Sequence, residues 1–446
     1  MKSFAARRAA LIAHMQSRGG GVAVIPTAPE VARNADADYP YRHDSYFYYL
    51  SGFQEPEAVI VLVVGKTTQS LLFCREKNLE REIWDGYRYG PEAARTSFGF
   101  DAAHPIAALD AEMPKLLANV PAIFYALGSD SKLDARVQGW LHAVRQQARA
   151  GVAAPSAAHD IHGLLNEMRL VKDADEIAAM RRAAVISSQA HERAMRASRP
   201  GLREYQIEAE LLHEFRRHGS QFPAYTSIVA AGANACVLHY RAGDAIMKDG
   251  DLVLIDAGCE FDSYAADITR TYPANGKFSG PQKELYEIVL AAQYAAIAET
   301  KPGKRFPDGH DAAVRVLAQG MLDTGLLDAN KVGTLDDVIA KGDYKQFYMH
   351  RTGHWLGMDV HDVGDYREPG EPAVDGEKPW RILRPGMVTT VEPGIYVRPA
   401  QGVPEQYWHI GIRIEDDALV TEEGCEIMTA SAPKTVAEIE AVMRQG

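Results

Sequence analysis

Hydrophobic positions in the first third of the chain form short continuous runs separated by turn residues. Residues 21–26, 59–64 and 70–73 are apolar and mostly rich in β-branched side chains, as buried strands are. Helical periodicity occurs on both sides of these runs, over residues 4–15 and 132–149. The alternation of strands and helices predicts a small α/β domain in this part of the chain.

A long helix begins the second region. Asp173 can cap this helix and Glu176 stands at its third position, which is the pattern of a capping box. Helical periodicity covers residues 173–197 and 204–218, and strands separated by Gly- and Pro-containing turns follow. We therefore predict domains at 1–172 and 173–446, and the second is an α+β domain built around hairpins rather than a βαβ array.

Two acidic residues interrupt the predicted strands of the second domain. An apolar run ends at Asp256, and Asp267 lies inside a second strand-like stretch at 264–272. If Phe261 and Asp262 form the tip of a hairpin, the two carboxylates become cross-strand neighbours with Cβ atoms about 5 Å apart. Such a pair needs a shared proton, an arginine or a cation to offset its repulsion, unless the hairpin is solvated.

Polar residues occupy buried-looking positions further along the chain as well. Glu392 ends an apolar strand, and in residues 410–415 the isoleucines face one way while Arg413 and Glu415 face the other. The segment HRTGHWLGMDVHD, which lies between the hairpin at 252–272 and these strands, contains His350, His354 and His361. Singly, each residue is explained by hydrogen bonding in a core. Together, four carboxylates and one imidazole from adjacent strands would form an oxygen-rich site for two divalent cations.

Composition excludes several other classes of function. A length of 446 residues with 46% hydrophobic content allows two domains, and a net charge of −12 gives no reason to expect nucleic acid or an anionic membrane as partner. The four cysteines form no CxxC pair, which suits a reducing compartment. No apolar run approaches the roughly 18–20 residues of a membrane span. The basic N-terminus fits a first helix better than a transit peptide, and we expect a cytoplasmic protein.

The order Asp256, Asp267, His354, Glu392 and Glu415 resembles the ligand order of the pita-bread metallopeptidases, most closely the aminopeptidase P family. The motifs that carry the resemblance are YRHDSYFYYLSGFQEPEAVIVLV (41–63), SIVAAGANACVLHY (227–240), HRTGHWLGMDVHDVG (350–364), VEPGIY (391–396) and VPEQYWHIGIRIEDD (403–417). The implied fold is α+β: a C-terminal pita-bread domain, similar to creatinase and methionine aminopeptidase, after a smaller α/β N-terminal domain. Residues 366–380 look like an insertion near the site.

The resemblance implies hydrolysis of the bond between an N-terminal residue and a following proline, by a hydroxide that bridges two divalent cations. Manganese is the expected metal, with cobalt, zinc and iron as alternatives. Asp256 would bind one metal, Asp267 and Glu415 would bridge, and His354 and Glu392 would hold the other. Proline-containing peptides are the expected partners, and a homo-oligomer, dimer or tetramer, is the expected assembly.

Further roles follow from the same resemblance. Glu392 would shuttle a proton, and His361 and His239 would lie around the scissile bond and steady the tetrahedral intermediate. Arg413 would fix a ligand carboxylate. If His354 and His361 both face the site, the chain must bend between them, and Gly357 is the expected position.

For three residues the sequence allows either a role in the site or a purely structural role. Tyr396 and Tyr225 are either substrate-pocket residues or aromatic core, and His350 is either close to the site or a plain structural histidine. Alternative functions are an Xaa-Pro dipeptidase (prolidase) with the same ligands, a non-catalytic pita-bread binding module, and a creatinase-like metal-free hydrolase. The complete ligand set disfavours the last two, and the VPEQYWHIGIRIEDD flank favours aminopeptidase P over prolidase.

Overall fold

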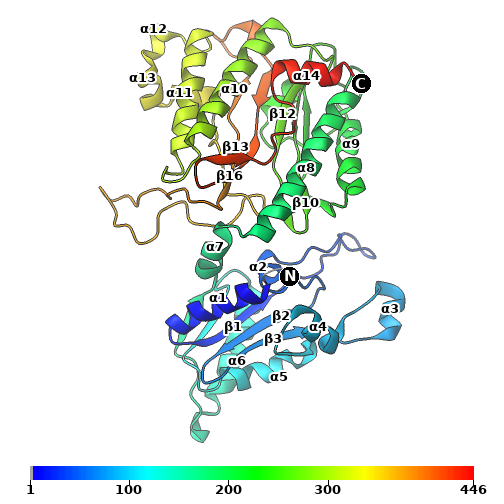
Figure 1. Cartoon of the computed structure of the whole chain (residues 1–446), viewed down its shortest axis with the longest axis vertical. Helices are drawn as coiled ribbons and strands as arrows, with labels where there is room; N and C mark the ends of the chain where they lie inside the picture. Colours follow the sequence, from blue (N-terminus) through cyan, green and yellow to red (C-terminus); the bar gives the residue numbers. More distant parts are fainter. Residues whose placement is uncertain (1–3, 446) are drawn as a thin grey trace. The chain divides into compact units, whose positions relative to one another are not determined.

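The computed structural model describes residues 4–445, which form two units divided between Met168 and Arg169 (Figure 1). The sequence-derived domain boundary between residues 172 and 173 stays a prediction. Within residues 4–445, no helix combines the length and the apolar character that crossing a membrane requires.

The first unit is built on a mixed sheet, as the alternation of strands and helices predicts. Within its described residues, six strands pair in the order β4-β3-β2-β1-β5-β6. They are β1 (Gly21–Pro26), β2 (Val59–Val64), β3 (Thr68–Cys74), β4 (Ala102–Pro105), β5 (Ala122–Tyr125) and β6 (Ala157–Asp160). β1, β2 and β3 are antiparallel neighbours, whereas β4, β5 and β6 join in parallel.

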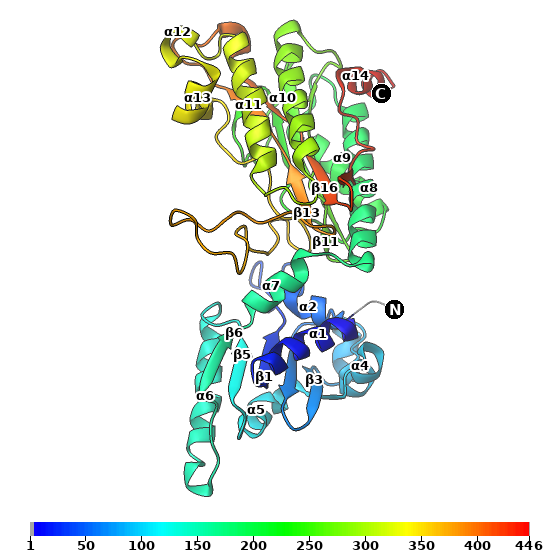
Figure 2. The ribbon, with the colours of Figure 1, turned by 60° about the vertical axis from the view of Figure 1, so that its left-hand side comes forward.

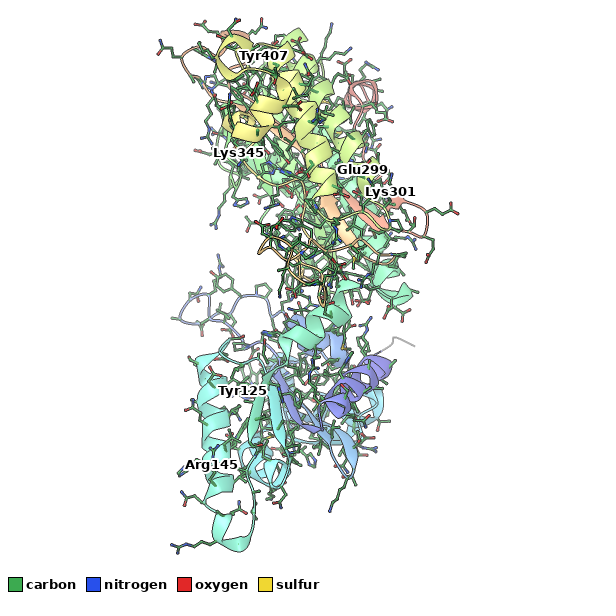
Figure 3. The ribbon with its side chains drawn as sticks, turned by 90° about the vertical axis from the view of Figure 1, so that its left-hand side faces the viewer. Tyr125, Arg145, Glu299, Lys301, Lys345 and Tyr407 are labelled. Atoms are coloured by element: carbon green, nitrogen blue, oxygen red, sulfur yellow. The ribbon has the colours of Figure 1, made fainter. Side chains whose placement is uncertain are left out.

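Helices cover this sheet and close its core. They are α1 (Phe4–Ser17), α2 (Ser45–Ser51), α3 (Leu79–Asp85), α4 (Gly90–Phe98), α5 (Leu109–Leu117) and α6 (Ser131–Arg145), with short turns η1 (Ile106–Ala108) and η2 (Ala148–Ala150). Val137 and Trp140 of α6 are buried in one cluster with Ile123 of β5. Figure 3 labels Tyr125 on that strand and Arg145 at the last residue of α6. α7 (His162–Leu170) spans the division between the units.

The second unit contains short antiparallel sheets. Its strands are β7 (Phe222–Pro223), β8 (Ile228–Ala231), β9 (Leu252–Asp256), β10 (Cys259–Phe261), β11 (Tyr264–Ala265), β12 (Thr269–Pro273), β13 (Val388–Val391), β14 (Gly394–Val397), β15 (Ile410–Arg413), β16 (Asp416–Val420) and β17 (Cys425–Ile427). They pair as β11-β10-β7, β12-β9-β8, β13-β16-β17 and β14-β15. The residues of the site lie at the ends of these strands and in the loops between them.

Two helix pairs, α8 with α9 and α10 with α11, lie on either side of the strands in Figures 1 and 2. The helices of this unit are α8 (Ala174–Ala197), α9 (Glu204–Arg217), α10 (Gly280–Glu299), α11 (Asp308–Asp323), α12 (Ala329–Val332), α13 (Leu335–Lys341) and α14 (Val436–Met443), with turns η3 (Gly232–Cys236), η4 (Asp343–Gln346) and η5 (Glu405–Tyr407). The predicted capping box of α8 is confirmed: Asp173 and Glu176 each accept a hydrogen bond from the other's backbone N–H, at 3.0 and 2.9 Å.

The predicted hairpin forms, but the predicted register differs from the observed one by two residues. Asp262 and Ser263 form the tip, with positive φ angles of 53° and 71°, instead of Phe261 and Asp262. A tip that moves by one residue moves every cross-strand partner by two, and Asp256 therefore pairs with Thr269 rather than with Asp267. A shift of two keeps each side chain on its own face of the ladder.

Candidate metal centre

The five predicted metal ligands line one cavity of about 500 Å³ in the second unit. Each stands where a strand ends or a loop begins, and loops held on a rigid scaffold are where functional side chains are commonly found. Their places are the last residue of β9 (Asp256), the stretch between β11 and β12 (Asp267), the loop before β13 (His354), the residue after β13 (Glu392) and the link from β15 to β16 (Glu415).

Three of these side chains converge closely enough to hold one ion. Ligand atoms of Asp267, His354 and Glu415 all lie within 4.8 Å of one another. His354 Nε2 is 3.4 Å from Asp267 Oδ2 and 3.7 Å from Glu392 Oε1. His354 Nδ1 is 3.0 Å from the Trp355 carbonyl, which fixes its proton there and turns Nε2 toward the acids.

Tyr225 links the two aspartates that the hairpin brings together. Its hydroxyl is 2.6 Å from Asp256 Oδ1 and 2.5 Å from Asp267 Oδ1, so both carboxylates face the same point. Burial and the two aspartates raise the pKa of the Tyr225 hydroxyl well above its ordinary value, which keeps it protonated as a donor. Tyr225 therefore lies at the centre, not in an aromatic core remote from it.

Arg413 supplies a buried positive charge beside Asp256. Its Nη2 donates to Asp256 Oδ2 at 2.6 Å, its Nη1 to the Tyr396 hydroxyl at 2.9 Å and its Nε to Thr269 Oγ1 at 3.0 Å. Thr269 Oγ1 in turn donates to Glu415 Oε2 at 2.6 Å. The guanidinium thus orients one predicted ligand, Asp256, directly and another, Glu415, through a hydroxyl group.

The four carboxylates of the site carry more negative charge than the neighbouring Arg413 and His354 can neutralise. Burial and the neighbouring acids raise the pKa of Glu415 well above its ordinary value, and burial raises that of Asp256. Burial also raises the pKa of Glu392 to about 7. Burial opposes protonation of His354, but Asp267 and Glu392 outweigh it and raise its pKa to about 9. An oxygen-rich donor set with one imidazole and excess negative charge fits divalent cations of the manganese type.

The other predicted histidines also reach the cavity. His239 and His361 line it, and the ring centroid of His361 is 4.1 Å from that of His354. His350 lines the cavity too, and its Nε2 lies 2.9 Å from the hydroxyl of Tyr396, a buried residue behind the cavity wall. Burial lowers the pKa of His350 to about 4, so this ring is neutral at physiological pH.

The loop that carries His354 and His361 bends from Gly357 onward, as expected. A Cβ on Gly357 would lie 2.1 Å from Asp362 Oδ2, so only glycine permits this close approach. Asp362 is fixed by Arg169 Nη2 at 2.6 Å and by Lys172 Nζ at 2.9 Å. The bend is therefore anchored by a buried ion pair.

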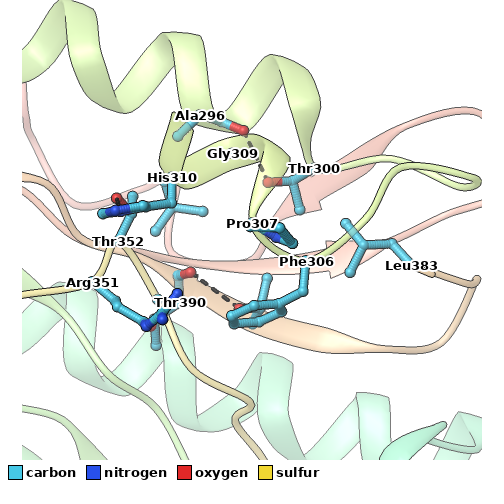
Figure 4. Close-up of a pocket in the computed structure, with 13 residues that line it drawn as sticks. Ala296, Thr300, Phe306, Pro307, Gly309, His310, Arg351, Thr352, Leu383 and Thr390 are labelled. Atoms are coloured by element: carbon cyan, nitrogen blue, oxygen red, sulfur yellow. Dashed lines mark hydrogen bonds between the residues drawn. The ribbon is translucent and has the colours of Figure 1, made fainter. Parts of the chain in front are cut away.

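A second, smaller cavity of about 30 Å³ lies behind residues 351–353, which also line the first cavity in part (Figure 4). His310 of α11 points at Thr352 there, with Nδ1 2.9 Å from Oγ1. Tyr348 contacts the same hydroxyl at 2.6 Å, and the Thr352 carbonyl accepts from Glu392 N–H at 2.8 Å. Polar contacts behind the wall thus hold the backbone next to Glu392.

Several residues of the site were missed by sequence reasoning. Thr269 connects Arg413 to Glu415, and Asp417 accepts the backbone N–H of Asp267 at 3.2 Å. Arg241 and Arg351 line the cavity. Both arginines stand next to motif histidines, Arg241 two residues after His239, and this proximity is the signal that could have found them.

A cavity lined by buried carboxylates and histidines at the ends of antiparallel strands is the kind of site that metal-dependent hydrolases use. Residues 178–422 match the model of Metallopeptidase family M24, and residues 4–124 match that of Aminopeptidase P, N-terminal domain. The chain belongs to metallopeptidase family M24. The predicted enzyme class and the predicted fold, a pita-bread domain after an α/β domain, are thereby confirmed.

Full-length relatives support the assignment. The Xaa-Pro aminopeptidase of Escherichia coli is 45% identical over 444 residues, which is 99% of this chain and 97% of that protein. The structure of Pseudomonas aeruginosa aminopeptidase PepP is 50% identical with a TM-score of 0.94, and covers 99% of this chain and 98% of that one. A zinc-substituted E. coli aminopeptidase P in complex with product has a TM-score of 0.93 at 44% identity, with the same coverage.

Proposed function

We propose that this metallopeptidase removes an N-terminal residue that is followed by proline, with two divalent ions, manganese by expectation, in its site. The observation that carries the proposal is the convergence of Asp267, His354 and Glu415 within 4.8 Å, in a chain 45% identical to an Xaa-Pro aminopeptidase. Asp256 and Glu392 complete the proposed ligand set from the same cavity.

Three of the five proposed ligands are held by neighbouring groups that orient them toward a cation. His354 presents Nε2, Asp256 is held by Arg413, and Glu415 accepts from Thr269. When bound, the two cations would lower the pKa of a water molecule between them so that hydroxide is available at neutral pH. The chain contributes position and charge, because its donors are already oriented before a metal arrives.

Proton transfer and carbonyl orientation are assigned to other groups. Glu392 takes the proton of the attacking water and returns it to the leaving nitrogen, since its carboxylate lines the cavity beside the other proposed ligands. His361 and His239 donate hydrogen bonds toward the scissile carbonyl, where negative charge develops. Tyr225, which lines the cavity, and Tyr396, which contacts His350 and Arg413 of its lining, are assigned to the substrate pocket.

A metal-exchange experiment tests the proposal. The protein is depleted of metal, refilled with Mn²⁺, Co²⁺, Zn²⁺ or Fe²⁺ separately, and assayed on Xaa-Pro, Xaa-Pro-Yaa and Xaa-Ala-Yaa peptides. We expect cleavage only before proline and two equivalents of metal at full activity. Equal rates on Xaa-Ala-Yaa would contradict the proline requirement, and exclusive cleavage of Xaa-Pro dipeptides would identify a prolidase.

We also propose that the protein is a cytoplasmic homo-oligomer. Its four cysteines are free, which suits a reducing compartment. α3 presents Leu79, Ile83 and Trp84 at exposures of 72%, 81% and 82%, an apolar face that another subunit could cover. Sedimentation equilibrium tests the assembly, and a species at the chain mass of 49.0 kDa across micromolar concentrations would contradict it.

A further inference from the structure

Two arginines stand at the open side of the metal cavity. Arg241 and Arg351 line it and are exposed, whereas Asp267 and Glu415 are buried at its base. Within residues 4–445, neither guanidinium forms an ion pair, while Arg413 of the same cavity is committed to Asp256. The mouth of the cavity therefore carries two cationic groups that are available to a ligand.

The inserted segment restrains one of these arginines. The guanidinium of Arg351 lies 5.1 Å from the ring centroid of Trp380, at the end of the insertion. Arg367 stacks on the same ring at 3.8 Å and pairs with Trp380 as a β-bridge. A cation held against an indole ring keeps its charge but loses part of its freedom, so less entropy is lost when it binds a partner.

Acidic residues of the insertion do not neutralise this mouth. Residues 366–380 contain four acidic and two basic side chains, and three of the acids are engaged in local ion pairs. Glu368 pairs with Arg384, Glu371 with Arg305 at 3.2 Å and Glu377 with Arg367 at 3.6 Å. None of the three acids is among the described residues that line the cavity.

The charge balance then favours an anionic ligand at the mouth. Two divalent cations would offset the charge of the four carboxylates among the proposed ligands. The positive charges of Arg241 and Arg351 then have no acidic partner in the cavity as residues 4–445 form it. The chain as a whole carries −12 and attracts no acidic peptide at long range. A preference for acidic peptides would therefore come from this local pair, within about 10 Å at 0.1 M salt.

We infer that Arg241 and Arg351 select peptides that carry a carboxylate beyond the proline. The inference rests on the proposed function, because a peptide with its first residue at the metal centre leads its later residues toward the mouth. The carboxylate belongs either to the side chain of an aspartate or glutamate or to the free C-terminus of a short peptide. Both sources present the planar pair of oxygens that a guanidinium binds.

Matched tetrapeptides separate the two sources. The substrates are Ala-Pro-Glu-Ala-amide, Ala-Pro-Gln-Ala-amide and Ala-Pro-Gln-Ala with a free C-terminus, assayed with the Mn²⁺-loaded enzyme. We expect kcat/KM to be about threefold to tenfold higher for at least one carboxylate peptide than for the neutral peptide, and the ratio to shrink at 0.5 M salt. Calorimetric binding of Pro-Glu-Ala-amide and Pro-Gln-Ala-amide should show the same order without turnover.

Substitution of the arginines decides whether they cause the preference. Arg241→Gln and Arg351→Gln should each reduce the ratio, and the double variant should bring it to about one. Arg315→Gln is the control, because it removes an equal charge from an exposed position on α11. A ratio of one in the unmodified enzyme, or a ratio unchanged in the double variant, overturns the inference. Failure to cleave any of the three peptides would instead contradict the proposed function.

Discussion

At the scale of single residues, the proton on His354 Nδ1 determines which nitrogen faces the acids. The Trp355 carbonyl accepts that proton at 3.0 Å, so Nε2 is the nitrogen from which a cation would displace a proton. The same logic applies to Asp267, whose two oxygens face Tyr225 and His354. Small polar contacts thus prepare the ligands, and they can be tested one at a time.

Replacing Asp267 with alanine should abolish turnover and reduce bound metal. The change removes the carboxylate that converges with His354 and Glu415, and the remaining acids lose a shared cation. We expect kcat/KM to fall more than about 100-fold, with at least one metal equivalent lost by elemental analysis. Near-normal turnover with two bound metals would show that Asp267 is no ligand.

His361→Ala and His239→Ala should slow the reaction without releasing metal. Both histidines line the cavity but lie outside the proposed ligand set, so their contacts act on the transition state. We expect kcat to fall about 10²–10³-fold in each variant while the metal content stays at the level of the unmodified enzyme. Loss of a metal equivalent in either variant would move that histidine into the ligand set.

His191 of α8 should make the fold sensitive to acid. Its Nε2 donates to the Ala257 carbonyl at 2.8 Å, and its buried Nδ1 has no hydrogen-bond partner in residues 4–445. Burial lowers its pKa to about 4, below the unfolded value of about 6.5. The unfolded chain therefore binds the proton first, and stability present above pH 6.5 is lost as the pH falls toward 4.

Urea unfolding of metal-free protein measures this loss. Between pH 7.5 and pH 5, His191 should account for about 2 kcal/mol of lost unfolding free energy. His191→Gln can keep a donor to the Ala257 carbonyl but does not titrate. Its unfolding free energy should therefore fall by about 2 kcal/mol less than that of the unmodified protein between pH 7.5 and pH 5. Equal losses in both proteins would assign the acid sensitivity to other groups.

At the scale of elements, the hairpin of β9 to β12 depends on one glycine. A Cβ on Gly258 would lie 1.7 Å from the Ala266 carbonyl oxygen, next to Asp267. Gly258→Ala must therefore displace the segment between β11 and β12 that carries Asp267. We expect a destabilisation of about 2 kcal/mol or more and a loss of metal affinity, measured by urea unfolding and metal titration.

Gly280 at the start of α10 is the matched control for this substitution. No heavy atom lies within 4 Å of a Cβ built there, so Gly280→Ala should leave metal affinity unchanged and stabilise the protein by up to about 1 kcal/mol. A Gly258→Ala protein as stable as the control would mean that the hairpin tolerates a wider spacing.

The sequence predicted the elements around the site better than their register. Capping at Asp173 is local, and it was predicted correctly because the interaction spans only three residues. The hairpin tip was placed one residue early because Asp262 and Ser263 adopt positive φ without a glycine to mark them. Arg351 was missed because its place in the cavity depends on a loop fold that has no hydrophobic period.

At the scale of the whole molecule, the length of the preferred peptide follows from the open side of the cavity. Exposed Arg241 and Arg351 border this side, so the residues of a substrate peptide that follow its proline can extend out of the cavity. We expect Ala-Pro-Ala to be cleaved at least as well as Ala-Pro, measured as kcat/KM. A preference for the dipeptide above about tenfold, roughly 1.4 kcal/mol of discrimination, would identify a prolidase.

The wide spacing of the proposed ligands along the chain has a consequence for synthesis. Asp256 and Asp267 are translated long before His354, and Glu415 comes last. A nascent chain that ends before β15 and β16 presents only part of the donor set, so it cannot retain a full metal complement. A peptidase that matures in this order stays inactive during synthesis, because its donor set is complete only after Glu415 has been translated and the last strands have paired.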